Sequence, residues 1–377
     1  MTSPVRNRCT IRASIFAVGV SIAFSFEALA APVDLDIPRL QADAQRGSIK
    51  EQIELGAAYF VGRGVTQNEK LAAYWYEKAA NAGDPGAQNQ IGYLYQVGIG
   101  VPKDPVRAVH WYERATAGGF TYAKVNLAIA YLWGTGVHQD LQLAMRLLQE
   151  AVEKGNGLAA CYLGDIYKMG VGVPKSEDTA KHWYEIGAKL HDPRAQFKLG
   201  LMLSCDQCSS ADLNRAVKLT RDSATAGLVS AKHQLALLLV QKPELATSPQ
   251  EAISLLAEAS SAGFWRSSVL LGILAREGKM MPRDPKEAYY HFRVATLQGG
   301  TEASQLVAND LRRLEANLDA AQREEISKRA AEWFQQHHLS LTFIFPSGDN
   351  AKQFPAYALE GPEKDMHAGR LIATPSL

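Results

Sequence analysis

The chain has 377 residues, of which 47% are hydrophobic, and a formal net charge of +1 at pH 7. This length allows two or three ordinary domains or one long array of repeats. A near-neutral charge excludes the strong basic field with which nucleic-acid-binding proteins attract phosphate, so we expect no nucleic-acid partner.

Residues 1–30 have the three parts of a Sec-type signal peptide. Three arginines lie within the first twelve residues, residues 15–26 are apolar or small, and Ala28-Leu29-Ala30 is a small-x-small cleavage site. The apolar stretch is shorter than the roughly 20 residues that a membrane-spanning helix needs, and no cysteine stands at the cleavage site. We therefore expect cleavage after about Ala30 and a periplasmic or secreted mature chain with no lipid anchor and no stable membrane insertion.

After a short lead-in, residues 31–40, the chain repeats itself seven times over residues 41–300. Each copy carries a marker pair 36 residues after the previous one, at Leu55-Gly56, Ile91-Gly92, Leu127-Ala128, Leu163-Gly164, Leu199-Gly200, Leu235-Ala236 and Leu271-Gly272. An alanine column has the same period, at Ala72, Ala108, Ala144, Ala180, Ala216, Ala252 and Ala288. So regular a period indicates a solenoid of two-helix units.

The first copy shows the physical reasons for these columns. Ala72, Trp75 and Ala79 lie on one face of its second helix, where small side chains let two helix backbones approach. Gly83 follows that helix, and glycine is the residue that best takes the left-handed conformation of a helix end. Gly62 provides a tight reversal between the two helices.

The second copy, IGYLYQVGIGVPKDPVRAVHWYERATAGG from Ile91, resembles the Sel1-like repeat, a relative of the tetratricopeptide-type helical repeats. The first and fourth copies match this pattern closely as well. The resemblance implies an all-α, right-handed solenoid. It also implies a scaffold that presents its surface to other proteins, often in bacterial envelopes or at host contacts.

The C-terminal part departs from the repeat. Residues 301–338 are predicted to form a partial eighth repeat and a capping helix, with Ile326, Ala330, Trp333 and Phe334 on one face to close the open end of the solenoid. Residues 339–377 show no period and are expected to be mostly irregular.

The fifth copy replaces its glycine turn with a Cys-x-x-Cys at Cys205 and Cys208. We favour a disulfide, as expected in an oxidising compartment. A zinc site, a redox-active pair and a reduced pair remain open, although a second pair of zinc ligands is missing.

No motif of a familiar enzyme accompanies the repeats. Ser-x-x-Lys, Lys-Thr-Gly and Gly-x-Ser-x-Gly are all absent, and the nine histidines are scattered. We therefore predict no catalytic, cofactor or metal site, and no enzymatic activity.

Partner-binding residues are expected on the first helices of the copies, which line the concave side of such a solenoid. The candidates occupy two columns next to the marker pairs: Gln90, Tyr93, Asn126, Tyr162, Asp165 and Lys198. In the later copies the same columns hold Leu201, Leu237, Leu270 and Ile273. These apolar residues either complete the core or line a groove for a partner peptide or for the chain's own segment 341–345.

The function predicted from these observations is that of an exported, non-enzymatic scaffold that holds one or more envelope or secreted proteins on its concave face. Two alternatives remain. One is a glycan-binding or polysaccharide-secretion scaffold, and the other is a secreted effector that engages a host protein.

Overall fold

The computed structural model describes residues 35–205, 208–248 and 250–338. The predicted signal peptide and the predicted irregular tail lie outside these residues. Every regular element of the described part is a helix. This confirms the prediction of an all-α solenoid.

Seven helix pairs follow a single leading helix, α3 (Ile37–Gln45). The first four pairs are α4 (Ile49–Val61) with α5 (Glu69–Asn81), α6 (Pro85–Val97) with α7 (Pro105–Ala117), α8 (Thr121–Trp133) with α9 (Leu141–Glu153), and α10 (Gly157–Met169) with α11 (Glu177–Lys189). The remaining pairs are α12 (Pro193–Leu203) with α13 (Ser210–Thr225), α14 (Val229–Gln241) with α15 (Glu251–Ser261), and α16 (Trp265–Glu277) with the first part of α17 (Pro285–Glu315). A short 3-10 helix, η1 (Pro243–Leu245), joins α14 to α15.

An eighth pair follows the seventh without a loop. Gly300 lies inside α17 with non-helical angles, φ 56° and ψ −132°, so this element is two helices joined at a kink. The second part of α17 packs with α18 (Ala320–His338), and Ile326 and Ala330 of α18 are buried against α17. These residues close the C-terminal end of the core.

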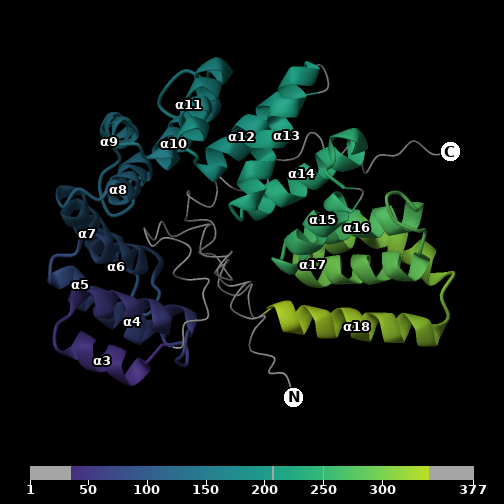
Figure 1. Ribbon diagram of the computed structural model, residues 1–377, viewed down its shortest axis with the longest axis horizontal. Helices are drawn as coiled ribbons and strands as arrows, with labels where there is room; N and C mark the ends of the chain where they lie inside the picture. The colour runs from purple at the N-terminus through teal and green to yellow at the C-terminus, as the bar shows by residue number, and fades with distance from the viewer. Residues whose placement is uncertain (1–34, 206–207, 249, 339–377) are drawn as a thin grey trace.

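The helix pairs are arranged along an arc (Figure 1). Its N-terminal end is formed by α3 and its C-terminal end by α18. In the first four copies α4, α6, α8 and α10 lie toward the inside of the arc, whereas α5, α7, α9 and α11 lie toward the outside. The first helix of each of these copies therefore faces the concave side.

Local sequence signals fix the ends of the helices. Asp104 caps the start of α7 because its side chain accepts the backbone N–H of Arg107 at 3.0 Å. Gly98 ends α6 with φ 81° and donates its N–H to Leu94 at 2.8 Å. In copy four His191 takes the place that a glycine has in most other copies, and it adopts the same left-handed region with φ 59°.

Packing within each copy depends on a pair of positions 20 residues apart. In four of the five copies whose marker pair ends in glycine, a ring of the second helix approaches that glycine, as Tyr112 approaches Gly92 and Phe292 approaches Gly272; in copy five, Thr220 lies against Gly200 instead. A Cβ added at Gly272 would lie 2.6 Å from Phe292 Cε1. Copies three and six have alanine at the first position and a smaller leucine at the second, Leu148 and Leu256.

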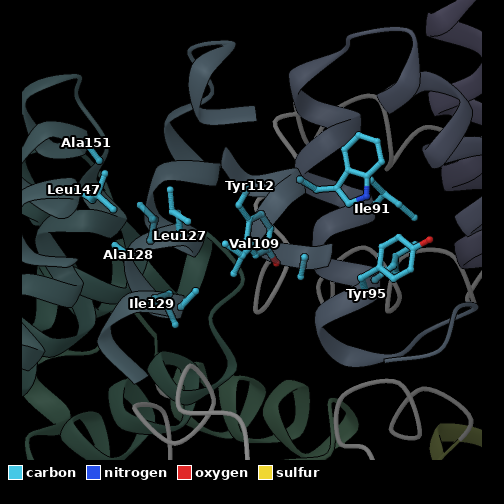
Figure 2. Packing of buried hydrophobic residues seen from close by; sticks show 14 of the residues in the cluster. Ile91, Tyr95, Val109, Tyr112, Leu127, Ala128, Ile129, Leu147 and Ala151 are labelled. Atoms are coloured by element: carbon cyan, nitrogen blue, oxygen red, sulfur yellow. The ribbon is translucent and has the colours of Figure 1, made fainter. Parts of the chain in front are cut away.

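The core runs continuously through the first four copies. Figure 2 shows Leu127, Ala128 and Ile129 of α8 between Tyr112 of α7 and Leu147 of α9. Each helix pair therefore buries one apolar face against its own partner and another against the next copy, as in other repeat arrays.

The leading helix α3 was not expected from the sequence, and the predicted boundary between lead-in and array at residues 40 and 41 falls inside it. Leu40 and Ala44 of α3 are buried in one cluster with Leu55 and Trp75. Gly47, with φ 98°, stands 36 residues before Gly83. The helix α3 is thus the end of an incomplete repeat that covers the first complete one.

Candidate partner-binding face

The six residues predicted to bind a partner all lie on first helices. Gln90 and Tyr93 are on α6, Asn126 is on α8, Tyr162 and Asp165 are on α10, and Lys198 is on α12. Because α6, α8 and α10 lie toward the inside of the arc (Figure 1), five of the six residues belong to helices of its concave side, and Lys198 belongs to α12 of the next copy.

Amide side chains connect copies two and three. Asn126 donates from Nδ2 to Oδ1 of Asn89 at 2.8 Å, and Asn89 donates from Nδ2 to Oε1 of Gln90 at 3.5 Å. Asn89 and Gln90 are buried, whereas Asn126 is half-buried. These amides satisfy one another inside the array, so Asn126 is the member of the group that reaches the surface.

An ion pair connects copies four and five. Lys198 Nζ donates to Asp165 Oδ1 at 2.7 Å, and the side chains are 15% and 7% exposed, respectively. The Tyr184 hydroxyl of α11 donates to the same carboxylate oxygen, also at 2.7 Å. Removing one partner of such a buried pair commonly costs about 3–5 kcal/mol because the other charge stays buried. Asp165 therefore has a structural role at the junction of α10, α11 and α12.

Two tyrosines complete the predicted set. Tyr162 is buried, and its hydroxyl is 3.5 Å from Nη1 of Arg194 on α12. Tyr93 is half-buried and packs against the core cluster of the first four copies. Its ring therefore has one side on the core and part of its area exposed.

The structure brings the predicted residues into two separate groups. Gln90 and Asn126 meet through Asn89, and Asp165 meets Lys198. Gln90, Tyr162 and Asp165 are buried, while Tyr93, Asn126 and Lys198 are half-buried. Only the latter three offer appreciable area to a partner.

Cys161 lies one helical turn from Asp165 on α10 and is buried. Burial raises the pKa of the Cys161 thiol well above its usual value, and the neighbouring Asp165 carboxylate acts in the same direction. Because the thiolate is the reactive form, Cys161 is an inert core residue.

The apolar columns of the later copies lie against the core. Leu270 is buried in the cluster of copies five to seven. Leu237 and Ile273 are half-buried and pack against core clusters. Leu201 is half-buried on α12. These contacts favour the core role of the columns, and segment 341–345, proposed as an occupant of a groove, lies outside the described residues.

Two exposed apolar residues on the first helices were not among the predicted partner-binding residues. Trp133 at the end of α8 is 36% exposed, and Met169 at the end of α10 is 47% exposed. Both directly precede the capping glycine of their helix, Gly134 and Gly170. Their equal position in the 36-residue register was the signal that could have identified them.

The turn of copy five contains a disulfide. The structure joins Cys205 and Cys208, whose Cα atoms are 5.1 Å apart. Within the part of the chain that the structure describes, no cluster of three or more His, Cys, Asp or Glu residues is arranged to hold a metal ion. Among the described helices, none combines the length and the hydropathy of a membrane span.

Comparison with solved structures finds similar folds. The chain is 29% identical to a Sel1 repeat protein from Oxalobacter formigenes, with 60% of this chain and 100% of that chain covered and a TM-score of 0.49. It is 22% identical to a protective antigen of uropathogenic Escherichia coli that displays an SLR fold, with coverages of 91% and 79% and a TM-score of 0.41. It is 20% identical to an immunity protein from Pseudomonas aeruginosa, with coverages of 64% and 88% and a TM-score of 0.36.

No match was found among curated proteins. The family model described as Sel1 repeat matches residues 52–84, 85–120, 121–156, 157–192, 193–228 and 267–300. The matched segments are more than half of the chain, and they omit copy six, whose turn contains η1. Proteins with this repeat generally mediate protein–protein interactions. The chain belongs to the Sel1 repeat family.

Proposed function

We propose that this protein is an exported, non-enzymatic scaffold that holds a partner protein along the concave face of its first five copies. The observation that carries the proposal is the alignment of α4, α6, α8 and α10 on the inside of the arc (Figure 1). Consecutive first helices place side chains at equal intervals along one surface, which suits an extended or helical segment of a partner. The predicted signal peptide supports the exported location.

Three half-buried side chains are the proposed contacts. Tyr93 can offer a ring whose orientation is fixed by the core behind it. Asn126 is held by Asn89, and its carbonyl oxygen can accept a hydrogen bond from a partner. Lys198 contributes a cation already fixed by Asp165. A surface fixed in this way before binding loses little conformational entropy when a partner docks.

Site-specific photocrosslinking in intact cells tests the proposal. A photoreactive phenylalanine replaces Tyr93 on the inner helix α6 in one variant. In a matched variant it replaces Tyr74, which is 48% exposed on the outer helix α5. The proposal predicts one discrete protein adduct from position 93 and none from position 74.

The same experiment can contradict the proposal. Identical adducts from both positions would show that the partner does not prefer the concave face. The absence of an adduct from position 93 would show that Tyr93 does not contact a partner. Incubating the purified protein with peptidoglycan or exopolysaccharide addresses the alternative class, because retention on the glycan without any protein adduct would favour a glycan-binding scaffold.

A further inference from the structure

The turn between the two helices of a copy has one construction in most of the array. The N-cap residue of the second helix donates its backbone N–H to a carbonyl near the end of the first helix. The bonds run from Asn68 to Tyr59, Asp104 to Tyr95, Asp140 to Tyr131, Ser176 to Tyr167 and Asp284 to Ala275, at 2.8–2.9 Å. This bond closes the turn of copies one to four and of copy seven.

Copy five is built differently. Its first helix, α12, has 11 residues where α6, α8 and α10 have 13, and its second helix, α13, has 16. Asp212 stands in the column of Asp104 but lies inside α13, and its N–H binds Ser209 Oγ at 3.1 Å. The amide that closes the turn in copies one to four and in copy seven is therefore used to cap α13.

A disulfide occupies the place of the missing closure. Cys205 follows α12 after one residue and Cys208 precedes the N-cap of α13. The backbone N–H of Cys208 also binds the carbonyl of Cys205 at 3.1 Å. The covalent bond thus holds together the two helix ends that the backbone bond holds together in copies one to four and seven.

The start of α13 is a contact point between neighbouring copies. Leu213 packs against the core cluster of copies five to seven, and Ala216 is buried in the cluster that contains Tyr184 of copy four. Arg215 Nη1 lies 3.4 Å from Glu185 Oε1 on α11. If the first turn of α13 became disordered, contacts with the copies on both sides of copy five would therefore be disturbed.

We propose that Cys205 and Cys208 form a redox-sensitive joint of the solenoid, whose disulfide fixes the start of α13 and whose reduction by a dithiol releases it. The step is an ordinary exchange reaction. One thiolate of the dithiol attacks the sulfur of Cys205, and Cys208 leaves as a thiolate that takes up a proton. The second thiol of the reductant then displaces Cys205, so two electrons and two protons pass to the cysteines and the reductant leaves as a disulfide.

Exposure favours reaction at this pair. Cys205 is exposed and Cys208 is half-buried, whereas the third cysteine of the described residues, Cys161, is 2% exposed inside α10. A reductant can therefore reach the bridge while the remaining thiol stays in the core and does not exchange with it.

Hydrogen–deuterium exchange of the full chain tests the joint. The protein is compared in its oxidised form, after dithiothreitol treatment, and as the Cys205→Ser/Cys208→Ser variant. For so short a loop, the chain-entropy treatment of a disulfide gives about a twentyfold change in the opening equilibrium. We therefore expect amides at the start of α13 to exchange about twentyfold faster after reduction, with α6, α7 and α16 unchanged.

The serine variant is the control. It should show the fast pattern without reductant and should not respond to dithiothreitol. Equal exchange at the start of α13 in the oxidised and reduced forms would overturn the proposal. So would faster exchange throughout the array, which would indicate general unfolding, or a bridge that dithiothreitol does not open in the native chain, as measured by labelling of the released thiols.

Discussion

The packing of the array can be tested by replacing Gly272 with alanine and Phe292 with leucine. Copies three and six carry these two residues at the equivalent positions. Gly272→Ala alone would place a Cβ 2.6 Å from Phe292 Cε1 in a buried contact. Overpacking of this kind costs about 1–3 kcal/mol. Alanine is favoured over glycine inside a helix by about 1 kcal/mol. We therefore expect a net loss of about 0–2 kcal/mol in the free energy of unfolding.

Phe292→Leu alone leaves space beside Gly272, and we expect a loss of about 1–2 kcal/mol from the cavity. Together the two changes reproduce the alanine and leucine of copies three and six. The alanine methyl then fills part of the space that the ring leaves. The double variant should lose less than about 1 kcal/mol, so the two sites should be coupled by about 2 kcal/mol.

Urea unfolding of the four proteins of this double-mutant cycle, followed by far-ultraviolet circular dichroism, measures the coupling. The reverse exchange in copy three, Ala128→Gly with Leu148→Phe, is the matched control and should show coupling of the same sign. Effects that add to within about 0.5 kcal/mol would refute the reasoning, because independent sites behave in that way.

Three further predictions follow from individual contacts. Lys198→Met should lower the free energy of unfolding by about 3 kcal/mol, because Asp165 stays buried without its cation, and Asp165→Asn in the same chain should recover part of the loss in urea unfolding. Gly100→Ala should lower the melting temperature more than Gly119→Ala. Both glycines have positive φ, but only at position 100 would the new Cβ approach a backbone oxygen, that of Glu69, at 2.1 Å; equal shifts would contradict this. His233 is buried, and burial lowers its pKa from 6.5 to about 3. The unfolded chain therefore binds a proton that the folded chain does not, and stability present above pH 6.5 is lost as the pH falls toward 3, by at most about 1.4 kcal/mol per pH unit. His233→Gln should flatten that dependence in urea unfolding measured from pH 7 to 4, and an unchanged slope would contradict the assignment.

The 36-residue period was sufficient to predict the architecture, because a repeated two-helix unit can bury its apolar face only against copies of itself. The same register contained the signal for α3, since Gly47 precedes Gly83 by one period. That helix was missed because Asp36, rather than a small residue, stands in its alanine column and only its last turns are formed.

The chemistry of the concave face was less predictable. A column assigns a residue to a helix face, but it does not reveal a partner on the next copy. Asp165 and Lys198 are 33 residues apart, and Asn89 and Asn126 are 37 apart, so both pairs cross the repeat register rather than follow it. These contacts depend on how α6 packs beside α8 and how α10 packs beside α12, which the sequence columns do not contain.

Differential hydrogen exchange is the most direct test of the concave face as a binding surface. Once crosslinking at position 93 has identified the partner, exchange is measured for the protein alone and in complex with that partner. Binding along the inside of the arc predicts slower exchange in α6, α8 and α10 and unchanged exchange in α5, α7 and α9. Slower exchange confined to the outer helices would contradict it.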